Sequence, residues 1–121
     1  MSKKQKVMKT QNLIPIGGHR SVNPQRVVAL VADVNYTYAH LDDGKVVVVA
    51  TPLKTLAARF ESDIFFRTHK SYLINLSFVE SYDKVHHHFV IMPNNLRAEV
   101  ARRKRTAFRA TMQNLNSLII S

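Results

Sequence analysis

The sequence predicts a mostly β domain of antiparallel strands, with one short internal helix and a second helix at the C-terminal end. Three observations support this fold class. Short runs of β-branched and apolar residues alternate with turn signals between Leu13 and Val100. Apolar residues recur at helical spacing over residues 53–60 and again after Ala101. The chain has 121 residues, enough for a single domain with one modest core.

The N-terminal part is expected to contain a basic arm and an edge strand. Residues 1–12 are predicted to form a flexible arm, because they carry several lysines and little that could be buried. Residues 13–16 form a short apolar segment that ends at the turn signal Gly17-Gly18, and Pro15 suits only an edge strand. Residues 19–25 are polar, so a loop is expected there.

Residues 26–50 are predicted to form a meander of about three strands. The first strand is expected over residues 26–33, which contain a continuous apolar run, and the second over residues 35–41, which alternate in polarity. Asp43 and Gly44 are a typical central pair of a hairpin turn, so residues 45–50 are expected to return as the third strand.

A short amphipathic helix is expected after the meander. Thr51 is predicted to be its N-cap and Pro52 its first helical residue. Apolar residues then recur at helical spacing as far as Phe60, while Lys54 lies elsewhere on the helical wheel. The polar residues 61–63 are expected to end this helix.

Residues 65–76 combine an apolar strand with a polar turn. Phe65 and Phe66 are expected to anchor the stretch in the core, at the end of a strand over residues 64–67. Residues 67–71 are predicted to be held out on a short, rigid turn, where they offer hydrogen-bond donors to a partner. Further strands are expected over residues 78–82, 85–92 and 96–100, with turns at residues 83–84 and 93–95.

From Ala101 onward the pattern changes to that of a helix, whose first turns are strongly basic. Cations at a helix N-terminus oppose the helix macrodipole, so folding alone gives no reason for them and a binding partner is favoured. Residues 113–121 are expected to be the helix end or a tail, and their apolar side chains leave a homodimer open. The cations are Arg102, Arg103, Lys104, Arg105 and Arg109.

The charge balance indicates a polyanionic partner. The chain has 18 Lys and Arg against 8 Asp and Glu, a formal net charge of +10, which favours DNA, RNA or an anionic membrane surface. It has no cysteine, which excludes disulfides and thiolate metal sites. The sequence also has no apolar run long enough to cross a membrane and no signal-peptide pattern. A cytoplasmic protein without a membrane partner is therefore expected.

The sequence does not indicate an enzyme. It lacks a glycine-rich phosphate loop and a nucleophile-elbow motif, and its carboxylates are scattered. The pair His69 and Ser71 is interpreted as two polar turn residues, because no orienting acid is evident nearby. His86 and His88 would share one face of a strand, but the sequence places no further metal ligand. We therefore expect no catalytic residue, cofactor or metal site.

The cations gather in groups that suit nucleic acid. Besides the N-terminal arm, one group lies in the turn, with Arg67, His69 and Lys70, and another lies within residues 97–109. Lys54 and Arg59 form a smaller group. Arginine can pair bidentately with a guanine edge, whereas lysine, serine and histidine can donate to phosphates or single acceptors. The groups together predict a nucleic-acid surface.

Residues 66–76, FRTHKSYLINL, resemble the signature of LytTR-type DNA-binding domains. That signature runs Phe-x-Arg-x-His-Arg/Lys-Ser-Tyr, two hydrophobic residues and Asn. Further matches stand at suitable separations, namely DVNYT at residues 33–37, Asp43-Gly44, LKTL at residues 53–56 and VARR at residues 100–103. The resemblance covers residues 26–112, far more than a short chance motif.

The resemblance implies a domain of packed small sheets, here over residues 13–112, that binds double-stranded DNA in bacterial transcription regulators of the response-regulator type. Such domains insert loops into successive major grooves, often at direct repeats. The implied contacts are Asn35, Tyr36 and Thr37 in the first loop, Arg67, His69, Lys70 and Ser71 in the signature, Arg102 and Arg103 after the last strand, and Lys54, Lys104 and Arg105 at phosphates. Phe66, Tyr72 and Asn75 are expected to hold the signature turn in place.

Two departures from the family pattern are visible. Ala101 stands where the family usually has serine, which puts one phosphate contact in doubt. Only about 25 residues precede the domain, too few for the receiver domain that family members usually carry, so control by phosphorylation is not expected. Two other interpretations stay open: an RNA-binding module, and an interaction module controlled by a regulatory protein partner.

Overall fold

The fold contains ten strands, two α-helices and three short 3-10 turns within residues 12–83, 85 and 88–120, which the computed structural model describes. The strands are β1 Ile14–Gly17, β2 Arg20–Val22, β3 Val27–Asp33, β4 Tyr36–Leu41, β5 Val46–Val49, β6 Phe65–His69, β7 Tyr72–Asn75, β8 Ser81–Asp83, β9 Phe89–Met92 and β10 Leu96–Glu99. The helices are α2 Leu53–Arg59 and α3 Arg105–Ile120, and the 3-10 turns are η1 Pro24–Arg26, η2 Leu76–Phe78 and η3 Arg102–Lys104.

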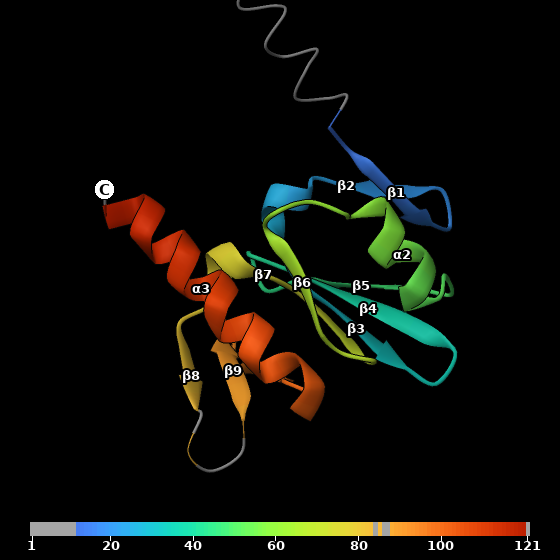
Figure 1. Ribbon diagram of the computed structural model, residues 1–121. Helices are drawn as coiled ribbons and strands as arrows, with labels where there is room; N and C mark the ends of the chain where they lie inside the picture. The colour runs from blue at the N-terminus through green and yellow to red at the C-terminus, as the bar shows by residue number, and fades with distance from the viewer. Residues whose placement is uncertain (1–11, 84, 86–87, 121) are drawn as a thin grey trace, which may run out of the picture.

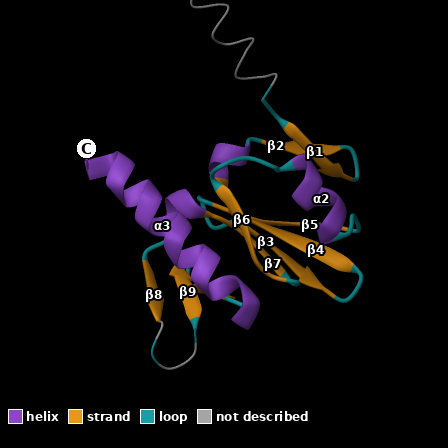
Figure 2. Cartoon of the chain, in the orientation of Figure 1, coloured by secondary structure: helices purple, strands orange, loops and turns teal. Residues whose placement is uncertain are grey.

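The strands form three antiparallel sheets, which confirms the expected mostly β fold class. The central sheet has five strands in the order β5-β4-β3-β7-β6, and it is flanked by the pair β1-β2 and by the three-stranded sheet β10-β9-β8. Figures 1 and 2 show β1, β2 and α2 on one side of the central sheet, and β8, β9 and α3 on the other.

Strand β3 is buried on both faces because both are covered. Val27 and Leu30 pack into the core under β1, β2 and α2, whereas Val28 and Ala29 pack into the core under β8–β10 and α3. A β-bulge between Val27 and Ala29 places two consecutive residues on one face. The continuous apolar run in the sequence thus reflects a strand between two cores, as in other doubly covered sheets.

Aromatic side chains hold the two covering layers to the central sheet. In the first core, Phe60 at the end of α2 meets Phe65 of β6 edge to face, with ring centroids 5.2 Å apart. In the second core, Phe108 of α3 is fully buried between Phe66 and Tyr82. Each fully buried aromatic side chain contributes about 1.5–3 kcal/mol to stability, so these contacts fix how α2 and α3 dock.

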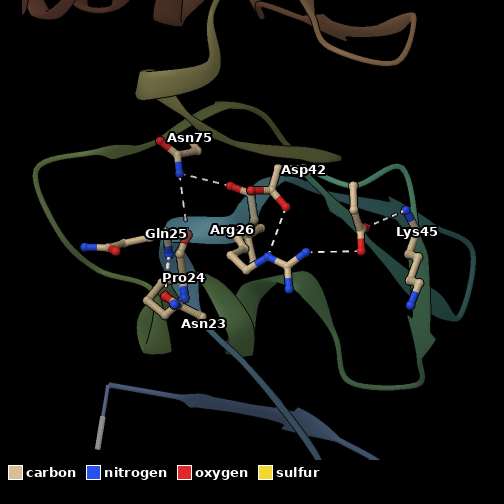
Figure 3. A network of polar contacts seen from close by, with 9 residues as sticks. Asn23, Pro24, Gln25, Arg26, Asp42, Lys45 and Asn75 are labelled. Atoms are coloured by element: carbon tan, nitrogen blue, oxygen red, sulfur yellow. Dashed lines mark hydrogen bonds and ion pairs between the residues drawn. The ribbon is translucent and has the colours of Figure 1, made fainter. Parts of the chain in front are cut away.

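A polar network ties the first residues of β3 to the last residue of β7 (Figure 3). The Asn75 amide donates to the carbonyl oxygen of Val27 at 2.9 Å, and its side-chain oxygen accepts from the Ser77 amide at 2.9 Å. Beside it, Arg26 pairs with Asp42 at 3.0 Å and Asp43 at 3.1 Å across the β4–β5 turn. The Lys45 amide and Arg26 lower the pKa of Asp43.

The first half of the chain differs from the sequence-based expectation in two places. Residues 19–25 were expected to be a loop, but Arg20–Val22 pairs with β1 as strand β2. Thr51 was expected to be the N-cap of α2, but that position belongs to Pro52, which forms no side-chain cap. The Thr51 hydroxyl instead donates to the carbonyl oxygen of Ile16 at 2.6 Å, because it faces the β1–β2 hairpin.

In the second half, strand β6 is longer than expected, whereas β8 and β9 are shorter. Strand β6 continues to His69 instead of ending at residue 67, and η2 precedes β8, which begins only at Ser81. Strand β9 begins at Phe89 instead of residue 85, because His88 has a φ of 53° and interrupts extended backbone. Helix α3 begins at Arg105, so Arg102–Lys104 form a 3-10 turn before it.

Some expectations fall outside the described residues. These are the basic arm up to residue 11, the turn at Lys84, and the pairing of His86 with His88 as a metal site. The same holds for the side chains of Leu118, Ile119 and Ile120, on which the expectation of self-association rested. Among the residues that are described, no helix is long and apolar enough to cross a membrane.

Candidate nucleic-acid interface

The β6–β7 turn is held rigid by side chains of its own residues. The Arg67 guanidinium donates from Nε to the His69 carbonyl oxygen at 3.0 Å and from Nη2 to the Lys70 carbonyl oxygen at 2.6 Å. The Ser71 amide donates to Nδ1 of His69 at 3.0 Å. Partial burial lowers the pKa of Arg67. Arg67 was expected to face DNA, but its hydrogen bonds make it a brace for the turn.

Lys70 and Ser71 occupy the tip of this turn. Lys70 is exposed, and Ser71 is half-buried. The carbonyl oxygen of Ser71 accepts a hydrogen bond from the Ala32 amide at 2.9 Å, which extends the pairing of β7 with β3. This bond places the β6–β7 turn beside the end of β3, where the chain turns into β4.

The β3–β4 turn is the second part of the surface. Asp33 pairs with Tyr36, so Val34 and Asn35 form its tip, and all four residues are exposed. Thr37 was expected to be a DNA contact, but it is fully buried and its hydroxyl donates to the Thr51 carbonyl oxygen at 2.7 Å. Side chains alternate across a strand, so the exposure of Tyr36 turns Thr37 inward.

The basic segment Arg102–Lys104 begins directly beside the β6–β7 turn. The Ala101 amide donates to the Thr68 carbonyl oxygen at 2.7 Å, and Nε2 of His69 lies 3.8 Å from a Glu99 carboxylate oxygen. Burial, with Glu99 nearby, raises the pKa of Tyr72, which packs against His69. These contacts bring two groups of cations together that lie more than thirty positions apart in the sequence.

The cations of the basic segment differ from Arg105, the first residue of α3. Arg102, Arg103 and Lys104 are exposed, whereas Arg105 is half-buried and donates from Nε to the Val100 carbonyl oxygen at 3.3 Å. Neither η3 nor α3 has an acidic residue in its first turn. The exposed cations and the absence of a side-chain cap at the start of η3 therefore give this end of α3 a positive potential.

Lys54 completes the surface from a different element. It is exposed in the first turn of α2, which follows Thr51 closely. Because the Thr51 carbonyl oxygen accepts from Thr37 at the start of β4, α2 begins at the same end of the central sheet as the β3–β4 turn. Figure 1 shows the β3–β4 turn, the β6–β7 turn and the start of α3 on one side of the molecule.

Asn75 differs from its expected role, and Val34, which had none, is unusually exposed. Asn75 was expected to hold the signature turn, but it lies at the far end of β7, where it binds Val27. Val34 stood only within the DVNYT match at residues 33–37 and had no expected role of its own, yet its side chain is 93% exposed at the tip of the β3–β4 turn. Its position between Asp33 and Asn35, two residues common in turns, was the available signal.

Comparisons with known proteins identify the family of this chain and agree with its fold. The family model of the LytTr DNA-binding domain matches residues 18–113. A solved structure described as the LytTr DNA-binding domain of a methyl-accepting/DNA response regulator from Bacillus cereus superposes with a TM-score of 0.67 at 20% identity, over 83% of this chain and 94% of that chain. No curated protein matches significantly. The chain belongs to the LytTR family of DNA-binding domains, which serve bacterial transcription regulation.

Proposed function

We propose that this protein binds double-stranded DNA sequence-specifically and reads the major groove with loops. The observation that carries the proposal is a pair of backbone hydrogen bonds. The Ala32 amide donates to the Ser71 carbonyl oxygen and joins the β3–β4 turn to the β6–β7 turn. The Ala101 amide donates to the Thr68 carbonyl oxygen and joins the basic segment to the β6–β7 turn. Three loops far apart in sequence thereby form one surface whose spacing the backbone fixes, which is what base recognition requires.

The residues of this surface suit two different tasks. Tyr36, Lys70 and either Arg102 or Arg103 are exposed at its loops, and we assign them to base edges. The other candidate residues can donate to phosphate oxygens, and we assign Lys54, Ser71, Lys104 and Arg105 to that task. Nδ1 of His69 accepts a hydrogen bond from the Ser71 amide, so His69 orients Ser71 besides any contact that it makes with DNA itself.

Selection of bound duplexes from a random library tests the proposal. The expected result is one enriched motif, present once or as direct repeats, that the protein binds more tightly than a scrambled duplex by about a thousandfold or more at physiological salt. Equal affinity for all duplexes would leave only charge-driven binding and would contradict sequence-specific recognition.

A second candidate is an RNA-binding module, which one observation favours. Tyr36 and Tyr38 lie on the same face of β4, and Tyr36 is 52% exposed, so the sheet offers an aromatic surface on which bases could stack. Competition between the selected duplex and structured RNA distinguishes the two. Sequence-specific DNA binding predicts that RNA displaces the protein only at a large excess.

A further inference from the structure

We propose that Val34 recognises thymine by contact between its side chain and the C5-methyl group of that base. This inference rests on the proposed DNA-binding function and adds a specificity-determining residue to it. Val34 is 93% exposed, more than the other large hydrophobic side chains among the described residues that are exposed. A valine side chain in full contact with water contributes nothing to the fold by burial.

The backbone of Val34 makes this position more unusual. Its φ is 52°, a left-handed conformation in which a β-branched residue is an outlier. A hairpin turn with a positive φ at this position favours glycine, asparagine or aspartate. Such strain tends to occur at functional sites, where the conformation serves to present a side chain. At the tip of this turn, the strained backbone holds an apolar group outward.

The surroundings of Val34 indicate what this apolar group meets. It follows Asp33, which pairs with Tyr36, and the preceding Ala32 binds Ser71 of the β6–β7 turn. Val34 therefore projects from the surface that carries Lys70 and the basic segment. In the major groove, the thymine methyl is the apolar group among the base edges, and small apolar side chains contact it. Valine has no side-chain donor or acceptor for any other base feature.

The test uses the duplex selected from the random library, in which each thymine is replaced in turn by deoxyuridine. This change removes only the C5-methyl group and keeps the base pair. Wild-type protein is expected to lose about fourfold in affinity at one or two positions, the effect of one buried methyl group. In Val34→Gly this loss should vanish at those positions, and in Val34→Ala it should shrink, because alanine keeps a methyl group on a shorter side chain. Uracil at the other thymines should have the same effect as on wild type.

Two variants separate recognition from folding. Val46 is also an exposed valine, but it lies on β5 next to the β4–β5 turn, so Val46→Ala should keep the uracil penalty. Val34→Gly removes the strain of a positive φ, so it should melt at or above the wild-type temperature and still lose the penalty. A substitution at a residue with only a structural role would not abolish discrimination while the melting temperature stays at or above that of wild type.

Each outcome decides the inference. A penalty that persists in Val34→Gly, or a selected motif in which no thymine methyl matters, overturns the role of Val34 and leaves sequence-specific binding standing. Failure of the selection to yield any motif overturns the proposed function itself, and the inference with it. These two failures are distinguishable because the first occurs with specific binding intact.

Discussion

The Ala101 amide donates a hydrogen bond to the Thr68 carbonyl oxygen at 2.7 Å, and this bond joins the basic segment to the signature turn. Thr68 sits at the β-bulge between Arg67 and His69, where regular pairing with β7 is interrupted. The bulge leaves its carbonyl oxygen free for a residue outside the sheet. The link thus depends on backbone geometry, so it does not require the serine usual in the family at position 101.

The Thr68 side chain gives a prediction about stability. Within the described residues, its hydroxyl oxygen is buried and has no hydrogen-bond partner. Thr68→Val should therefore raise the free energy of unfolding by about 1 kcal/mol, because it removes an unsatisfied polar atom at nearly constant volume. Chemical denaturation measures the change, and Thr68→Ala is the control, which should destabilise by leaving a void. Lower stability of Thr68→Val would show that the hydroxyl has a partner.

Arg67 is predicted to stabilise the turn and not to read DNA. Arg67→Ala removes both hydrogen bonds to the carbonyl oxygens of His69 and Lys70, so it should lower the free energy of unfolding by about 1–2 kcal/mol, after allowance for partial exposure. Arg67→Lys should rescue little, because lysine lacks the planar fork that reaches both acceptors. Denaturation of the protein without DNA provides the measurement. Wild-type stability with strongly weakened DNA binding would instead make Arg67 a direct contact.

His40 on β4 predicts a dependence of stability on pH. Burial lowers the pKa of His40 below its ordinary value of 6.5, so the unfolded chain takes up a proton more readily than the folded one. The stability from neutral His40 is therefore complete above the unfolded pKa and is lost as the pH falls through about 6.5 towards the folded pKa. His40→Gln should flatten the unfolding free energy between about pH 7 and 5, measured by denaturation. Identical pH profiles would refute this assignment.

Much of the fold followed from the sequence because its signals were local. The Asp43-Gly44 hairpin, the apolar faces of α2 and α3 and the run in β3 each depend on side chains next to one another. The short strand β2 did not follow from the sequence, because its polar residues pair with β1 only through the backbone. His88 delays the start of β9 to Phe89 by a positive φ that its residue type does not demand.

The candidate site was predictable in its composition but not in its assembly. The exposed cations Lys70, Arg102, Arg103 and Lys104 were identified from charge and from the family pattern. Thr37 and Arg67 were assigned to DNA, since a pattern of residue types does not reveal which face of a strand is covered or which carbonyl oxygen lies within reach of a guanidinium. Those facts depend on tertiary packing, namely the cover over β4 and the bulge at Thr68.

The central claim is that the basic segment reads bases as part of a fixed surface. Its most direct test is the affinity of Arg102→Ala and Lys104→Ala for the selected duplex and for all its single-base variants. Arg102→Ala should lose about 1–3 kcal/mol at the cognate site and relax specificity at one position. Lys104→Ala should weaken every duplex alike and reduce the salt slope by about one. Lys45→Ala, at the exposed β4–β5 turn, is the matched control and should change neither. Wild-type affinity and specificity in both Arg102→Ala and Lys104→Ala would contradict the claim.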